Sequence, residues 1–433
     1  MTLNTLTIGH YGSISKYSFS HCSKASRTIT RIELITAQEL RRYFYSSIAI
    51  LFFFLLIGAR FVAADPINPY ITVGILYDDN LLRLANDEAA EKIINSTDTS
   101  DTKYSAEIGF DSLLRIKRQR VLLSAAVNEN KYSEFNELDH TGGHANVLLN
   151  WEVGRNWNGR TGFLYDRTIT DLDNIQRLLR DLKTRNRFLL EATRQLSPRW
   201  FFYLGTSYTD VDFSERSNVN KETIESTARG RYVSRADNEF GFEIKFADGD
   251  FPDRDEDDPS FTKTEATGFI SRSINRRSSI YLRGGFADRD ESSNTRSGFD
   301  GAIGQIDYYW KPSGKLSFKT SASRDLSTLN DEIQDFLVIE KFSFGPTWNV
   351  TSKLQLDAYI DIENRDGQGG GVEQSSGQPP RKDDLTTVGM GVNYTKSKNL
   401  TTYLNLESGE RKSNQDGREY DYNEIVLNIR FNL

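Results

Sequence analysis

The chain has 433 residues, of which 37% are hydrophobic and 27% are charged, and its mean hydropathy is −0.56. This composition excludes a membrane protein built from apolar helices, but it allows a β-barrel, whose strands need apolar residues only at alternate positions. The formal net charge is −7, which argues against nucleic acid as a partner. No shift in composition divides the sequence, so it predicts one large unit.

The start of the chain predicts a targeting segment. In residues 41–64, Arg41 and Arg42 precede an apolar run that is too short to span a bilayer, and the small residues 62–64 follow it. This pattern is typical of a secretory signal peptide and places the mature start at Asp65. The barrel domain is then expected over residues 65–433.

Residues 1–40 show no strand pattern, and we interpret them as an extension that results from a mis-assigned start codon; a functional extension is the alternative. The single cysteine, Cys22, lies before the predicted cleavage site. The mature chain therefore has no disulfide framework and no thiol chemistry.

From Tyr70 onwards one unit recurs, which consists of a strand, a long polar loop, a second strand and a short turn. In the first strand, Ile71, Val73 and Ile75 share one face, because side chains alternate along a strand. The short turns are expected at residues 117–120, 155–159, 197–199, 234–237, 275–278, 311–314, 351–352 and 396–398. Turns at this spacing predict an all-β, transmembrane, antiparallel up-and-down barrel of about 18 strands, with about 16 as the alternative.

Two predicted strands alternate poorly. Neither register is clean in residues 261–274, and in residues 336–348 the pattern slips around Glu340 and Lys341 before Pro346, which cannot donate to a ladder. We expect β-bulges in both. All five tryptophans lie in or near predicted short turns, which predicts an aromatic belt at one membrane interface.

The last ten residues form a strand that runs to the chain end, with Ile425, Leu427, Ile429, Phe431 and Leu433 on one face. An open apolar edge invites aggregation, whereas a closed barrel pairs its last strand with its first. Such an ending resembles the terminal signal of outer-membrane barrels. We therefore expect the outer membrane of a Gram-negative bacterium, with lipid, lipopolysaccharide and the barrel assembly machinery as partners.

The segment 73–84, with the sequence VGILYDDNLLRL, resembles the opening of the EpsL-like outer-membrane β-barrel proteins of exopolysaccharide operons, a porin-type group. This resemblance implies a passive conduit for exopolysaccharide export, supplied by a periplasmic or inner-membrane assembly. It transfers no catalytic residue. The sequence alone leaves open an uptake porin for small polar solutes, and also a structural or enzymatic barrel.

No catalytic, cofactor or metal site is predicted. His140 and His144 are interpreted as part of a polar loop, because they have neither a third ligand nor a nucleophile in a Gly-x-Ser-x-Gly setting. The acidic segment 248–258 and the Gly-rich segment 366–383 are interpreted as surface loops, and no nucleotide-binding loop occurs.

The inward faces of the predicted strands carry charges of both signs. They are interpreted as a hydrated wall braced by ion pairs, as a path for a polar solute, or as both. The possible pore-lining residues are Arg177, Arg180, Arg185, Arg187, Arg229, Glu243, Lys245, Arg283, Asp357, Asp361 and Arg430.

The loop before Arg185 has a helical pattern, with Leu172, Ile175 and Leu179 at suitable spacing and Asp171 or Asp173 able to cap the start. We hypothesise a short helix over residues 172–183 that folds inward and narrows the pore with basic side chains. A helix or plain loop standing outside the barrel is the alternative, and it is the interpretation that we favour.

Overall fold

The structure is a computed structural model, and it describes residues 67–254, 260–292, 298–328, 336–368 and 380–433. The predicted N-terminal extension (1–40) and signal peptide (41–64) lie outside the described residues. Parts of the predicted acidic loop (248–258) and Gly-rich loop (366–383) do so as well.

Within these residues the chain forms 18 strands, one after another. They are β1 (Asn68–Asp78), β2 (Asp101–Ile116), β3 (Gln119–Tyr132), β4 (His140–Val153), β5 (Trp157–Ile169), β6 (Leu182–Gln195), β7 (Trp200–Phe213), β8 (Lys221–Val233), β9 (Glu239–Asp250), β10 (Ser260–Asn275), β11 (Ser278–Glu291), β12 (Phe299–Trp310), β13 (Leu316–Thr328), β14 (Phe336–Asn349), β15 (Leu354–Gln368), β16 (Lys382–Ser397), β17 (Leu400–Ser413) and β18 (Tyr420–Asn432).

Four short helices lie in the loops of the described chain: α2 (Asp87–Ile94), η1 (Asn136–Leu138), α3 (Leu172–Ile175) and η2 (Ser217–Val219). None of the helices in the described part of the chain has the length and apolar character needed to cross a membrane.

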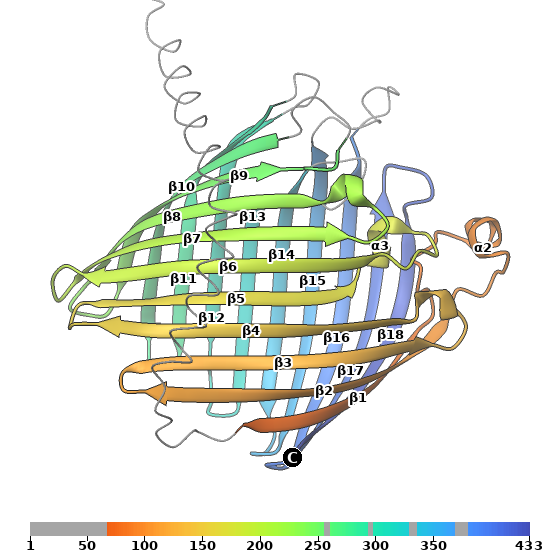
Figure 1. Cartoon of the computed structure of the whole chain (residues 1–433), viewed down its shortest axis with the longest axis horizontal. Coiled ribbons are helices and arrows are strands. Elements are labelled where there is room, and N and C mark those ends of the chain that lie inside the picture. Colours follow the sequence, from red (N-terminus) through yellow and green to blue (C-terminus); the bar gives the residue numbers. More distant parts are fainter. Residues whose placement is uncertain (1–66, 255–259, 293–297, 329–335, 369–379) are drawn as a thin grey trace, which may run out of the picture. The chain divides into compact units, whose positions relative to one another are not determined.

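Every strand pairs antiparallel with its neighbours in sequence, and β1 pairs with β18 from Tyr70↔Asn432 to Asp78↔Glu424 (Figure 1). The sheet therefore closes on itself and has no free edge. This confirms the predicted up-and-down barrel of 18 strands and the predicted role of the C-terminal strand.

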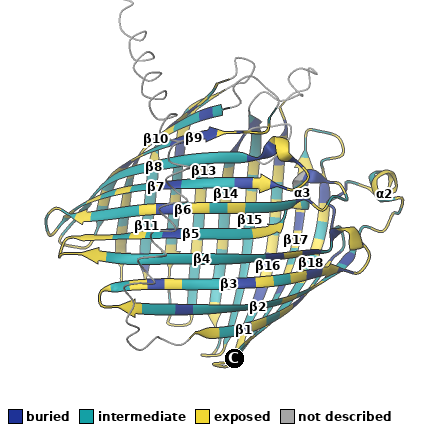
Figure 2. Cartoon of the chain, in the orientation of Figure 1, coloured by how far each residue is buried: buried dark blue, intermediate teal, exposed yellow. Residues whose placement is uncertain are grey.

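The two faces of the barrel wall differ as the alternation predicts. Apolar side chains such as Val73, Phe242 and Ile425 lie on the outer face and are about half exposed in the chain by itself. In a membrane, lipid would cover them. Fully buried residues are scattered and do not gather in one central core (Figure 2). The opposite face carries the polar and charged residues.

The two ends of the barrel also differ. The eight short turns and both ends of the strand series, Asn68 and Asn432, lie at one end, and the longer loops lie at the other. All five tryptophans lie near the short-turn end, on the lipid-facing side by strand register, and four are at least 41% exposed. Short turns are periplasmic in such barrels. The protein is an outer-membrane β-barrel of a Gram-negative bacterium.

Three sequence expectations need correction. Pairing of β14 runs through Glu340 and Lys341 without a register shift, because Glu340 faces outward and forms an ion pair with Arg324 of β13. In β10 the register shifts only at its periplasmic end, between Ser273 and Asn275. The two histidines do not lie in a loop, since β4 begins at His140.

Candidate functional site: the lumen and the loop across its outer end

Two charged rows face each other across the barrel. Lys183, Arg185 and Arg187 occupy alternate positions of β6, and the acidic row consists of Asp357, Asp361 and Glu363 of β15. In the closed ring of 18 strands, β6 and β15 are nine strands apart in either direction. Basic side chains of β6 and acidic side chains of β15 therefore lie on opposite sides of the lumen.

The register places nine of the predicted pore-lining residues on this inner face: Arg185, Arg187, Arg229, Glu243, Lys245, Arg283, Asp357, Asp361 and Arg430. Most of those charges have partners on nearby strands. Arg185 pairs with Asp166 at 2.8 Å, Lys341 with Asp361 at 3.0 Å, and Arg430 with Asp111 at 2.8 Å. The last pair reaches across β1, where the Arg430 guanidinium lies over the Tyr70 ring.

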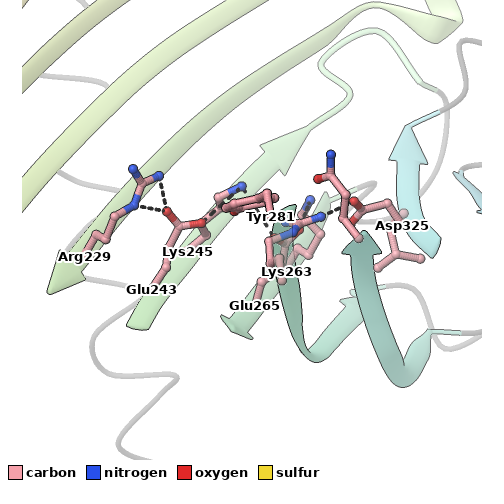
Figure 3. A pocket seen from close by; sticks show the side chains of 10 residues that line it. Arg229, Glu243, Lys245, Lys263, Glu265, Tyr281 and Asp325 are labelled. Atoms are coloured by element: carbon pink, nitrogen blue, oxygen red, sulfur yellow. Dashed lines mark hydrogen bonds and ion pairs between the residues drawn. The ribbon is translucent and has the colours of Figure 1, made fainter. Parts of the chain in front are cut away.

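A recess of about 450 Å³ opens in the inner wall along β8 to β13 (Figure 3). It is lined by Arg229, Glu243, Lys245, Lys263, Glu265, Tyr281, Arg283, Gln305, Asp325 and Leu326. The charges alternate along it: Arg229 pairs with Glu243, Lys263 with Glu265 at 2.7 Å, and Arg283 with Asp325. A recess with this lining suits a hydrated polar solute.

Lys263, Glu265 and Asp325 were not among the predicted residues. The pattern of β10 is blurred because Phe261 and Phe269 also face inward, where they lie over glycines of β9. A Cβ on Gly241 would come within 2.1 Å of the Phe269 ring. The inward-facing aromatic rings therefore lie flat against the wall. Because these rings are apolar, the inner face of β10 cannot be recognised from the alternation of polar and apolar residues.

The loop between β5 and β6, residues 170–181, is here named L3, and its base is tightly held. Asp181 is fully buried, and its carboxylate accepts a hydrogen bond from the Arg216 Nε at 2.8 Å and from the Glu215 backbone N–H at 3.0 Å. Across the base, the Thr170 N–H donates to the Asp181 carbonyl at 2.9 Å.

On its near side, L3 packs against apolar residues of the two preceding outer loops, L1 (79–100) and L2 (133–139). Leu172 and Leu178 of L3 contact a buried cluster. The cluster consists of Leu81, Leu82, Leu84, Ala90, Tyr132, Phe135 and Leu138, with Ile94 and Ile169 also packed against it.

On its far side, L3 reaches the opposite wall through polar contacts. The Asp173 carboxylate lies 3.7 Å from the Arg365 Nη1 on β15, and the Asp173 carbonyl accepts a hydrogen bond from Arg411 on β17 at 3.0 Å. Gln176 accepts from Arg418 at 3.2 Å and donates to the Arg83 carbonyl of L1 at 2.6 Å. Since β15 and β17 lie across the ring from β5 and β6, L3 spans the outer end of the lumen.

This arrangement corrects the expected extent of the helix. α3 covers only Leu172–Ile175, because Gln176 adopts a left-handed conformation with a φ of 48°. Arg177 and Arg180 are exposed, and Arg180 donates to the Asp139 carbonyl of L2 at 3.4 Å. L3 therefore lies across the outer end of the lumen and not outside the barrel, which was the favoured expectation. The acidic Asp173, and not a basic side chain, contacts the opposite wall.

The segment that carries the family resemblance has a structural role. The Asp78 carboxylate accepts from Arg83 at 2.7 Å and from the Asn80 N–H at 2.9 Å, so it fixes the start of L1. The Asp79 carboxylate accepts both the backbone N–H and the side-chain amide of Asn423, at 2.7 and 2.8 Å. These contacts tie the outer ends of β1 and β18 together where the barrel closes.

The site offers no evident catalytic or metal chemistry among the described residues. His140 is buried, its Nδ1 lies 2.8 Å from the Leu138 carbonyl, and His144 pairs in register with Asp166 across β4 and β5. Within the described ranges, no group of three or more His, Cys, Asp or Glu residues is placed to hold a metal ion.

No protein-family model and no curated protein match the sequence. Solved structures that resemble this chain include Pseudomonas aeruginosa OpdK with vanillate, at 9% identity and a TM-score of 0.48, covering 85% of this chain and 99% of that one. A second is P. aeruginosa OccK5 (OpdH), at 9% identity and a TM-score of 0.47, covering 85% of this chain and 98% of that one. A third is the siderophore receptor PirA of P. aeruginosa, at 9% identity and a TM-score of 0.43, covering 86% of this chain and 81% of that one. The fold assignment rests on the closed strand pairing itself.

Proposed function

We propose that the protein is a passive outer-membrane channel for small polar solutes. A ring of about 18 strands is wide enough for an aqueous lumen, and charges of both signs line this one. The observation that carries the proposal is L3, which is fixed to the wall on both sides and so narrows the outer end. A narrowed, two-signed passage suits a small hydrated solute better than a polymer chain.

Exopolysaccharide export, which the resemblance of residues 73–84 implies, is the second candidate. One feature favours it: Tyr359, Tyr403 and Tyr422 lie on the inner wall, and Glu407 accepts hydrogen bonds from two of them. Aromatic rings beside carboxylates suit sugar rings. No sequence comparison supports this role, and L3 would have to leave its position for a polymer to pass.

Swelling of liposomes that contain the purified barrel tests the proposal. We expect fast entry of arabinose and glycine and no entry of a large dextran. In cells, deletion should slow the uptake of such solutes and leave secreted polysaccharide unchanged. Normal uptake with lost polysaccharide would overturn the proposal in favour of export.

Charge reversal tests whether the basic row lines the path. Replacing Arg185 and Arg187 of β6 by Glu should shift the reversal potential in a salt gradient towards cation selectivity. Arg194→Gln is the matched control, because it lies on the same strand with its side chain on the lipid-facing side, against Trp157. An equal shift in the control, or no shift in the double variant, would contradict a path along this row.

A further inference from the structure

We propose that the inner wall formed by β15, β16 and β17 carries a binding site for the ring of a single neutral sugar. The sugar site is defined by Asp357 and Tyr359 of β15 and by Asn405 and Glu407 of β17. The inference rests on the proposed channel function and deepens it, because it names neutral sugars as a class of solute.

The four side chains surround two glycines of the strand between them. The partners in register are Tyr359↔Gly389↔Glu407 and Asp357↔Gly391↔Asn405. A Cβ at Gly389 would overlap the Tyr359 ring. A Cβ at Gly391 would overlap the Asp357 carboxylate. The ring and the carboxylate therefore lie flat against β16, in the space that side chains of this strand would otherwise fill.

The Tyr359 ring is fixed in place and is only half-buried. Its hydroxyl donates to the Glu407 Oε2 and accepts a hydrogen bond from the Asn405 Nδ2 at 3.4 Å. A ring held flat against the wall presents its other face to the lumen. In the neighbouring Tyr422 this face is covered, because the Arg83 guanidinium lies 3.7 Å above the ring. The C–H groups on one side of a sugar ring pack well on the electron-rich face of an aromatic ring.

Oxygen acceptors with unused capacity lie beside this ring. Asn405 is 9% exposed, and its Oδ1 has no hydrogen-bond partner in the described part of the chain. Among the described residues, no lysine or arginine forms an ion pair with Asp357. The Glu407 carboxylate accepts from the hydroxyls of Tyr359 and Tyr422 and has lone pairs left. An unpaired buried acceptor is costly, so this set favours a ligand that is rich in hydroxyl donors.

The burial of the Asn405 Oδ1 favours a sugar over an organic cation. This oxygen is shielded from solvent, so its donor must be small enough to enter beside the Tyr359 ring. A hydroxyl group is small enough, whereas a quaternary ammonium group is not. The Asn405 amide also offers a donor and an acceptor together, which matches a hydroxyl group, because a hydroxyl both donates and accepts.

The sugar site lies deeper in the lumen than L3. Along β17, Asn405 and Glu407 come before Arg411, which contacts L3 nearer the outer end of the strand. A solute that enters from outside therefore passes L3 before it reaches the site, so a single sugar fits the narrowed entrance.

Saturation-transfer NMR on the purified full chain in detergent tests the site, with methyl β-D-glucopyranoside as the probe and choline as the control ligand. We expect transfer to the glucoside that is strongest at the axial hydrogens of one ring face, because that face packs on Tyr359. Transfer spread evenly over both faces, no transfer to the glucoside, or tighter binding of choline would overturn the inference.

Two variants test the residues. Tyr359→Ala removes the ring and Asn405→Leu removes the amide, and each should raise the Kd of the glucoside about tenfold. Tyr203→Ala is the matched control. The Tyr203 ring also lies over a glycine, Gly205, but the Arg229 guanidinium lies above it at 5.3 Å. This variant should bind like wild type, and heat-modifiable migration on a gel should show that all three variants are folded. Equal affinities of Tyr359→Ala and Tyr203→Ala would overturn the inference.

Swelling of liposomes in arabinose separates this inference from the channel function. A barrel that admits arabinose and binds no glucoside would overturn the sugar site alone. A barrel that binds the glucoside with the expected ring face and is closed to arabinose would overturn the channel function alone.

Discussion

L3 is attached to the barrel in two physically different ways. On the near side, Leu172 and Leu178 pack against an apolar cluster from L1 and L2, three residues of which, Leu82, Ala90 and Leu138, are fully buried. On the far side, Asp173 and Gln176 make a few polar contacts with arginines that come from distant parts of the sequence. Charge screening by salt and competing ions do not weaken apolar burial, whereas they weaken partly exposed ion pairs.

The difference assigns separate tasks to the two sides. The near side and the base determine where the loop is anchored, and the far side determines whether it spans the lumen.

The largest effect is expected at the base. Asp181→Ala removes a buried carboxylate and leaves the buried Arg216 guanidinium without this counter-charge, which costs about 3–5 kcal/mol of local stability. Hydrogen exchange of the Glu215 and Leu182 amides should accelerate accordingly. The control is Asp166→Ala, whose pair with Arg185 has the same 2.8 Å length but is 32% and 51% exposed; about 1 kcal/mol or less is expected there. Equal effects at the two sites would show that burial does not distinguish them.

The apolar near side gives the next largest effect. Leu82→Ala opens a cavity at a fully buried position, and such truncations cost about 2–5 kcal/mol. We expect L3 to lose protection from hydrogen exchange in α3, with no dependence on salt. Ile93→Ala in α2 is the control, because that side chain is 38% exposed and surface changes cost about 0.5 kcal/mol or less. If high salt alone produced the same loss of protection, the near side would not be the anchor.

The barrel could be predicted from the sequence, whereas the contacts of L3 could not. Alternation in stretches such as residues 240–246 depends only on neighbouring positions, so the strand, its faces and the short turns can be predicted locally. The contact of Asp173 with Arg411 joins residues that are 238 positions apart, and no local period reports it.

The dependence on residues that are distant in sequence also explains why the pattern around Glu340 and the extent of α3 were predicted incorrectly. Glu340 was difficult to place because the Arg324 that neutralises it on the lipid-facing side belongs to another strand. The helical spacing of Leu172 and Ile175 arises from packing on L1 and L2, and the helix itself ends after one turn. Tertiary partners therefore decided both of these features.

The smallest expected effect is the pH dependence of amide protection in two outer loops. In both loops, a side-chain oxygen at the end of the loop accepts a hydrogen bond from a backbone N–H of the preceding strand. In L2, the Asp139 carboxylate accepts the Tyr132 backbone N–H at 2.8 Å, and in L4 (214–220) the neutral Asn220 side chain accepts the Phe213 N–H at 2.7 Å. This backbone hydrogen bond lowers the pKa of Asp139, and the nearby Lys131 ammonium, 3.1 Å away, lowers it further.

A carboxyl group with a lowered folded-state pKa stabilises the fold above its unfolded pKa of about 3.9 and loses that contribution as the pH falls through the folded value. Protection of the Tyr132 amide, corrected for the intrinsic exchange rate, should therefore be constant from about pH 7 to about pH 5 and decline below about pH 4. Protection of the Phe213 amide should not change, because Asn220 does not titrate. Asp139→Asn should make L2 behave like L4, and a decline that persists in this variant would place the titrating group elsewhere.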